Sequence, residues 1–268
     1  MTEADQAVAM QEASPFTGVR SRWLLLILIP CFFVSQYVIA RLGSLGLYPI
    51  QLILVLWLLI VVNRTKLSLN RLIGKIPASY NWWPIFFIAV LILVFSVGSS
   101  VLIAYPLLRY APDLFESWFL SDIIHPDFHL FIAAAIIAPV IEEPIFRGLL
   151  FSRLTIKWGA TKALIGSSIL FGILHPLPIG AFTFGLVACL LYIRTNTLKI
   201  PIALHVVHNL IVWGLATNQN SEMSAIEPGE LAYAGLVCTV LAAPLLFGLR
   251  GKWWPAKDIP IPYTLNRD

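Results

Sequence analysis

Charge is scarce in this chain: only 12% of its 268 residues are Asp, Glu, Lys or Arg, whereas 59% are apolar. An ordinary soluble domain carries about 25% charged residues, so roughly half of the usual solvating charge is missing. This shortage excludes a disordered chain, a nucleic-acid-binding protein and most cytosolic enzymes. A polytopic membrane protein is the class that remains.

Cysteine is also scarce, and the three residues present, Cys31, Cys189 and Cys238, all lie within apolar runs. Without a C-x-x-C pair they are interpreted as buried small apolar side chains, not as a disulfide or zinc framework. The sequence also lacks a G-x-S-x-G nucleophile elbow, an H-E-x-x-H helix, a P-loop and a G-x-G-x-x-G turn. A covalent mechanism through Ser or Cys therefore has little support.

Long apolar runs, by contrast, are abundant. A bilayer core about 30 Å thick requires about 20 apolar residues in a helix. Eight runs are candidate spans, at residues 23–40, 46–62, 82–108, 128–150, 161–175, 178–193, 200–216 and 231–249. The expected fold is an all-α polytopic bundle of about eight transmembrane helices (23–249), flanked by cytosolic tails (1–22 and 250–268).

The distribution of Lys and Arg predicts the orientation of this bundle. If the N-terminus is cytoplasmic and the chain crosses eight times, only Arg41 and Arg109 lie outside and Arg147 lies within a span. The remaining 15 of the 18 basic residues are then cytoplasmic. Because such a bias sets topology, the sequence predicts eight crossings with both termini cytoplasmic.

The fourth span contains three ionisable side chains, Glu142, Glu143 and Arg147, although charge within a membrane-spanning helix is costly. Glu143 and Arg147 are four residues apart, so they share one helix face and can pair. Glu142 is rotated by about 100° from Glu143 and cannot share that pairing equally. We therefore expect the partner of Glu142 to come from another helix.

Pro139 and Pro144 flank the two glutamates. Each proline removes a backbone hydrogen bond of the helix and frees a carbonyl group. We expect a kink or a local widening that opens space beside Glu142. A kinked packing helix with a buried ion pair is the alternative interpretation.

Two further spans carry polar side chains at helical spacing. Phe171 and His175 are four residues apart in the fifth span, and His205 and Asn209 are four apart in the seventh. A lone imidazole in an apolar helix is most often a hydrogen-bonded core residue, but three such spans together favour a polar site. His208 is close to the same face, and His205 is preferred because Asn209 lies one full turn from it.

A buried carboxylate, an imidazole and an imidazole–amide pair are the groups needed to hydrolyse an amide. The carboxylate takes a proton from water, the first imidazole holds that water, and His and Asn donors stabilise the oxyanion. Alternatively, Glu142, His175 and His205 could bind Zn²⁺, with an open position for water. The spacing does not decide between these two arrangements.

These residues resemble the three motifs of the CPBP intramembrane proteases, a family that includes the type II CAAX prenyl endopeptidases and the bacterial Abi proteins. The motifs E-E-x-x-x-R, F-x-x-x-H and H-x-x-x-N/D are matched in order by Glu142-Glu143-x-x-x-Arg147, Phe171-x-x-x-His175 and His205-x-x-x-Asn209. Each motif alone is weak, whereas all three in order on predicted spans are specific.

The resemblance covers residues 128–216 and implies that they form the catalytic core of an intramembrane endopeptidase. It implies four catalytic residues: Glu142 as the base, His175 as its partner, and His205 and Asn209 as the oxyanion site. It implies supporting roles for Glu143, Arg147 and Phe171. The implied cofactor is either Zn²⁺, held by Glu142, His175 and His205, or none, if a glutamate mechanism applies.

The expected partners are membrane lipid and a protein or peptide substrate, including lipid-modified CAAX-type chains, with no nucleic acid. The implied location is the bacterial inner membrane. The alternative function is a non-catalytic transporter, or a bacteriocin-immunity or binding protein, that uses the same polar cluster. Peptide cleavage that depends on Glu142 separates the enzyme from a transporter, for which ion-gradient-dependent uptake is expected instead.

Overall fold

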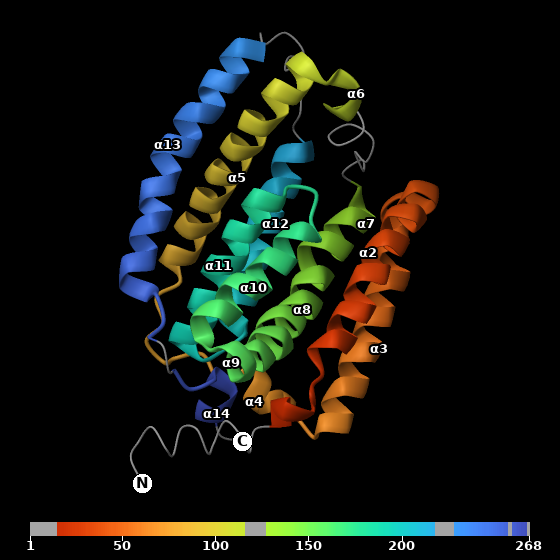
Figure 1. The fold of residues 1–268 in the computed structure, drawn as a ribbon, viewed down its shortest axis with the longest axis vertical. Helices are drawn as coiled ribbons and strands as arrows, with labels where there is room; N and C mark the ends of the chain where they lie inside the picture. Colours follow the sequence, from red (N-terminus) through yellow and green to blue (C-terminus); the bar gives the residue numbers. More distant parts are fainter. Residues whose placement is uncertain (1–14, 116–126, 218–227, 257–258, 267–268) are drawn as a thin grey trace.

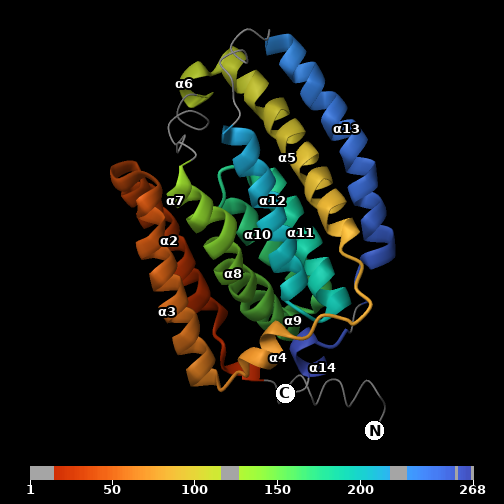
Figure 2. The ribbon, with the colours of Figure 1, turned by 180° about the vertical axis from the view of Figure 1, so that it is seen from behind.

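The computed structural model describes residues 15–115, 127–217, 228–256 and 259–266. Every regular element within these residues is helical, and the long helices run side by side as one bundle (Figures 1 and 2). The long helices are α2 (Ser21–Leu42), α3 (Leu47–Thr65), α5 (Trp83–Tyr110), α11 (Pro178–Thr195), α12 (Lys199–Thr217) and α13 (Pro228–Trp253). The prediction of an all-α polytopic bundle is confirmed.

The remaining elements are shorter and fall into two groups. The fourth predicted span is a succession of α7 (Phe128–Leu130), η4 (Phe131–Ile137), α8 (Ala138–Glu143), η5 (Pro144–Phe151) and α9 (Ser152–Trp158). The others are η1 (Pro15–Gly18), η2 (Gly43–Gly46), α4 (Leu69–Ile73), α6 (Pro112–Phe115), α10 (Ala160–Ile173) and α14 (Pro262–Leu265).

Each of the eight predicted spans coincides with one of these helical segments. Within the described residues, six segments are long and apolar enough to cross a membrane, and the first of them, Leu25–Thr65, contains both α2 and α3. The fifth predicted span is not among these six segments, because α10 has only 14 residues. Its predicted end at residue 175 is wrong: α10 ends at Ile173, since Pro176 disfavours helical backbone at His175.

The fourth span widens on both sides of the two glutamates, as predicted. Both η4 and η5 are π-helical, and the short α-helix α8 lies between them. Pro139 lies in the first turn of α8, and Pro144 begins η5. Because neither proline can donate a backbone hydrogen bond, the α-helical pattern is interrupted at each, and the neighbouring turns are wider.

Helices α5 and α13 approach closely at a pair of glycines. A Cβ added to Gly98 would lie 2.8 Å from the Gly235 carbonyl oxygen and 2.7 Å from the Thr239 hydroxyl. Small residues of this kind allow membrane helices to pack with their backbones near one another. The side-by-side arrangement of α5 and α13 in Figure 1 therefore depends on glycine at this crossing.

We expect Gly98→Ala to destabilise the protein by about 1–3 kcal/mol, because the added methyl group forces α5 and α13 apart. The matched control is Gly214→Ala in α12, where an added Cβ meets nothing within 4 Å. That variant should be neutral or slightly more stable, because alanine favours helix. Thermal unfolding in one detergent measures both, and equal melting temperatures for the two variants would contradict this packing.

One end of the bundle is strongly basic. Elements η1, α4, α9 and α14 lie at this end (Figures 1 and 2), which we call the basic end. Arginine and lysine side chains occupy the helix termini there: Arg20, Arg64, Arg71, Lys157 and Arg194. The described acids outside α8 lie elsewhere, at α6, before α7 and at the start of α13. This separation of basic from acidic residues agrees with the charge distribution that was used to predict the topology. The assignment of the basic end to the cytoplasmic side of the membrane stays a prediction.

Parts of the predicted tails pack against the basic end. Tyr263 of α14 is buried, its ring meets that of Phe16 edge-on at 5.1 Å, and the Arg71 guanidinium lies 4.5 Å from its centroid. Asn266 donates from Nδ2 to the carbonyl oxygens of Arg71 and Asn196, at 2.8 Å each. The described residues of 250–268 therefore form part of the folded domain.

At the opposite end, Asp127 joins η2 to the start of α7. Its Oδ2 accepts a hydrogen bond from the Ser44 hydroxyl at 2.6 Å, and its Oδ1 accepts from the Leu130 amide at 2.7 Å. The Ser44 hydrogen bond, followed by the Leu130 bond, holds the pKa of Asp127 below its usual range. The α2–α3 pair is thus tied to the helix that carries the glutamates.

Candidate functional site

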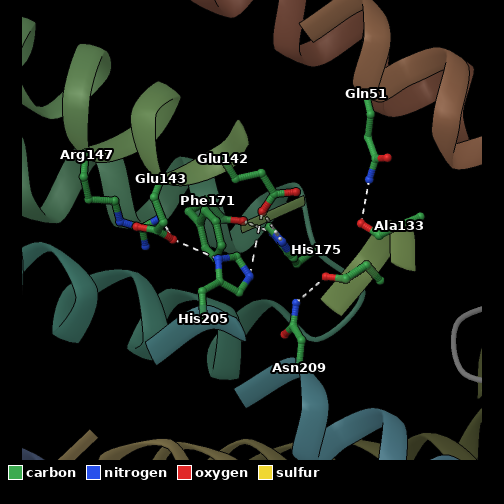
Figure 3. A network of polar contacts seen from close by, with 10 residues as sticks. Gln51, Ala133, Glu142, Glu143, Arg147, Phe171, His175, His205 and Asn209 are labelled. Atoms are coloured by element: carbon green, nitrogen blue, oxygen red, sulfur yellow. Dashed lines mark hydrogen bonds and ion pairs between the residues drawn. The ribbon is translucent and has the colours of Figure 1, made fainter. Parts of the chain in front are cut away.

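Glu143 is the centre of a buried polar network. Its Oε1 accepts hydrogen bonds from Arg147 Nη1 at 3.0 Å and from His205 Nδ1 at 2.9 Å. The side chains of Glu143 and Arg147 are 0% and 2% exposed, and that of His205 is 6% exposed. The predicted pairing within the fourth span is therefore present, and the carboxylate also reaches across to α12 (Figure 3). Glu143 thereby fixes the orientation of His205.

Phe171 of α10 is an aromatic platform beside this network. The Arg147 guanidinium lies 4.3 Å from its ring centroid, a cation–π contact in a buried setting. The imidazole of His175 lies against the same ring, with centroids 4.1 Å apart. One phenyl ring thus contacts both the cation that pairs with Glu143 and the imidazole that faces Glu142.

Glu142 faces two imidazoles from other elements. Its Oε2 lies 3.7 Å from His175 Nε2 and 4.0 Å from His205 Nε2. Both separations are longer than a direct hydrogen bond. Oε2 is buried and has no hydrogen-bond partner among the described residues. The whole side chains of Glu142 and His175 are nevertheless 24% and 28% exposed. This part of the network is therefore accessible from outside, whereas the Glu143 part is buried.

The hydrogen bonds of the imidazoles fix which ring nitrogens face Glu142. His175 Nδ1 lies 2.6 Å from the Phe171 carbonyl oxygen, which can only accept, so Nδ1 carries a proton. His205 Nδ1 likewise donates to the Glu143 carboxylate. In the neutral form of either ring, Nε2 is therefore the unprotonated nitrogen. Two imidazole nitrogens of known orientation converge on one carboxylate oxygen.

Asn209 lies one turn beyond His205 and contacts the π-helix η4. Its Nδ2 donates to the Ala134 carbonyl oxygen at 2.8 Å, which uses one of its two amide hydrogens. Gln51 of α3 donates from Nε2 to the neighbouring Ala133 carbonyl oxygen at 2.7 Å. Figure 3 shows these two amides approaching η4 from opposite sides. Asn209 is thus held beside the site with one amide hydrogen left to donate.

The residues selected from the sequence lie in one region (Figure 3), whereas the Nδ1 atom of His208 is directed to α5. His208 Nδ1 lies 3.4 Å from the Ala89 carbonyl oxygen of α5, away from the glutamates. Two neighbours of the site were not selected, Gln51 and Phe184, whose ring centroid lies 4.6 Å from that of His205. Gln51 could have been selected from the sequence, because it is the only amide side chain in the apolar run 46–62. Phe184 could not, because it is one apolar residue among many.

The donor types of Glu142, His175 and His205 suit Zn²⁺, and their Nδ1 hydrogen bonds are those found behind metal-binding imidazoles. As placed, Glu142 Oε2 lies 3.7 and 4.0 Å from the two Nε2 atoms, and among the residues that the structure describes no three His, Cys, Asp or Glu side chains are grouped as metal ligands. We therefore route no chemical step through a metal.

Residues 125–211 match the family described as type II CAAX prenyl endopeptidase Rce1-like. A curated relative from Bacillus subtilis (strain 168), named "Putative membrane peptidase YdiL", is 31% identical over 134 residues. The alignment covers 47% of this chain and 52% of the relative, so the chain spans about half the length of that protein. No solved structure matches. The resemblance seen in the motifs is confirmed for the segment that carries the site.

Proposed function

We propose that this protein is an intramembrane endopeptidase that hydrolyses peptide bonds of membrane-associated proteins with a water molecule activated by Glu142. The observation that carries the proposal is the unpartnered Oε2 of Glu142, which lies within 4.0 Å of two imidazole nitrogens. A water molecule that donates one hydrogen to Oε2 and the other to His175 Nε2 satisfies both of these atoms. The similarity to membrane peptidases supports the same reading.

In the first step, Glu142 takes a proton from this water as its oxygen attacks the carbonyl carbon of the peptide bond. The carbonyl π electrons move to the oxygen and form a tetrahedral oxyanion. Glu142 then returns the proton to the amide nitrogen as the C–N bond breaks, which releases a carboxylic acid and an amine. His175, held by the Phe171 carbonyl oxygen, keeps the water in line for attack.

His205 and Asn209 are the proposed donors to the oxyanion. The hydrogen bond from Nδ1 to Glu143 orients the His205 ring, and the proposed donor role belongs to the form of this ring that carries a proton on Nε2. Asn209 contributes its second amide hydrogen. Each such donor is typically worth about 10²–10³ in rate. Arg147 and Phe171 act indirectly, because they position Glu143 and His175.

The proposed substrates are proteins or peptides held at the membrane, including lipid-modified CAAX-type chains, and the proposed location is a bacterial inner membrane. The description of the matching family names prenyl endopeptidases, and the Bacillus relative is named a membrane peptidase. A test of the lipid requirement compares one peptide with and without a prenyl group on its cysteine. Faster cleavage of the prenylated form supports this substrate class.

Purified protein in proteoliposomes provides the test of the reaction class. Membrane-anchored peptides are added, products are identified by mass spectrometry, and ion uptake into the same vesicles is followed. We expect new peptide termini to form without ion-gradient-dependent uptake. Uptake without cleavage would favour the transporter alternative and contradict the proposal.

We propose the metal-free glutamate mechanism, in which the unpartnered Oε2 of Glu142 is itself the base. Activity should stay within about twofold of its initial value after exhaustive treatment with chelators, since the general base is a carboxylate. Metal content and cleavage rate are measured on the same preparation. Activity lost with the metal and restored by Zn²⁺ would overturn this mechanism.

A further inference from the structure

The α2–α3 pair carries a groove at the basic end, away from the glutamates. Its volume is about 540 Å³, within the range of about 300–1,000 Å³ for small-molecule sites. The lining residues that matter here are Arg20, Trp23, Ile27, Trp57, Ile60 and Arg64. None of them belongs to the segment 125–211 that matches the peptidase family.

The groove is cationic at one end and apolar along its length. Arg20 precedes the first turn of α2, and Arg64 lies in the last turn of α3, so both arginines stand at the mouth. Trp23 and Ile27 lie one turn apart on α2, and on α3 the residues Trp57, Ile60 and Arg64 follow at helical spacing. The apolar side chains therefore extend from the arginines toward the middle of the bundle.

Nothing in the described part of the chain neutralises these arginines by an ion pair. The described acids are Asp113, Asp127, Glu142, Glu143 and Glu230, and none belongs to the basic end. Trp23 is 54% exposed and Ile60 is 52% exposed, so the walls of the groove present apolar surface outward. A cationic mouth above an exposed apolar wall complements an anionic headgroup joined to an acyl chain.

We propose that this groove binds one acidic phospholipid, with its phosphate between Arg20 and Arg64 and an acyl chain along Trp57 and Ile60. Guanidinium groups bind phosphate through paired hydrogen bonds, and tryptophan is favoured at the membrane–water interface. A second groove along α3, which shares Ile60 with the first, is larger, about 850 Å³, but its lining includes one cation, Lys66, and no tryptophan. The arginine pair favours the first groove.

The test is native mass spectrometry of the full-length protein titrated with phosphatidylglycerol or phosphatidylcholine. The wild type should retain one phosphatidylglycerol and little phosphatidylcholine. Arg20→Gln with Arg64→Gln should weaken phosphatidylglycerol binding by about tenfold or more, because two cations near the headgroup are lost. The control Arg22→Gln removes an exposed arginine that does not line the groove and should stay within about twofold of wild type.

Two further measurements separate loss of charge from misfolding and a phospholipid from free phosphate. Arg20→Lys with Arg64→Lys retains the charges, so intermediate binding is expected even if the glutamine variant folds poorly. Inorganic phosphate should not displace the phospholipid, because the acyl chain contributes to binding. Equal retention of both phospholipids, or unchanged phosphatidylglycerol binding in the glutamine variant, would overturn the proposal. Peptide cleavage is not used in this test, so its outcome is independent of the proposed peptidase activity.

Discussion

Glu142→Gln is expected to lower the rate of peptide cleavage by about 10³-fold or more, with the protein still folded. Glutamine has nearly the shape of glutamate but cannot take a proton from water, so both the attack and the return of the proton are lost. Because Oε2 accepts no hydrogen bond from the described residues, the substitution breaks no hydrogen bond of that atom. The initial rate is measured in proteoliposomes at saturating substrate.

A matched control separates this effect from a general loss of charge. Glu230 lies in the first turn of α13 and is exposed, so Glu230→Gln removes one carboxylate without touching the network. The control should cleave at the wild-type rate. A Glu142→Gln variant that cleaves as fast as this control would show that another group activates the water.

Arg147→Met is expected to cost about 3–5 kcal/mol of stability and to lower the melting temperature by about 10 °C. The substitution leaves the Glu143 carboxylate buried without its cation, and an unpaired buried charge is strongly destabilising. It also removes the cation from the Phe171 ring. Thermal unfolding in one detergent, followed by intrinsic fluorescence, measures the change.

The control for this prediction is Lys162→Met, which removes an exposed cation from the first turns of α10. It should leave the melting temperature nearly unchanged. The double variant Glu143→Gln, Arg147→Met removes the unpaired carboxylate and should recover part of the loss, while the retained amide oxygen still accepts from His205. Equal melting temperatures for Arg147→Met and Lys162→Met would contradict a buried ion pair at this position.

The general architecture was predictable because membrane helices must be long and apolar and must satisfy their own backbone hydrogen bonds. The pairing of Glu143 with Arg147 followed from a spacing of four residues on one helix. The expectation that Glu142 has its partner on another helix followed from a rotation of about 100° that directs it away from that pair, whereas the identity of the partner was implied by the family resemblance. Local helix geometry thus predicts which polar side chains must contact a partner on another helix.

Contacts that depend on tertiary packing were not predictable in the same way. The sequence placed Glu143 beside Arg147, but the bond to His205 requires the relative positions of α8 and α12. The bond from Asn209 to Ala134 likewise depends on how α12 meets the π-helix η4. Tyr263 was assigned to a tail, because hydropathy does not distinguish a polar tail from a segment that packs at the edge of a bundle.

The proposed mechanism requires that Glu142 holds the nucleophilic water between its Oε2 and His175 Nε2. A high-resolution density map of the wild-type protein in lipid nanodiscs tests this most directly. We expect a water-sized peak within about 3 Å of both atoms, with His175 Nδ1 still hydrogen-bonded to the Phe171 carbonyl oxygen. A map in which Glu142 turns toward lipid, or in which His175 and His205 lie on opposite sides of the bundle, would contradict it.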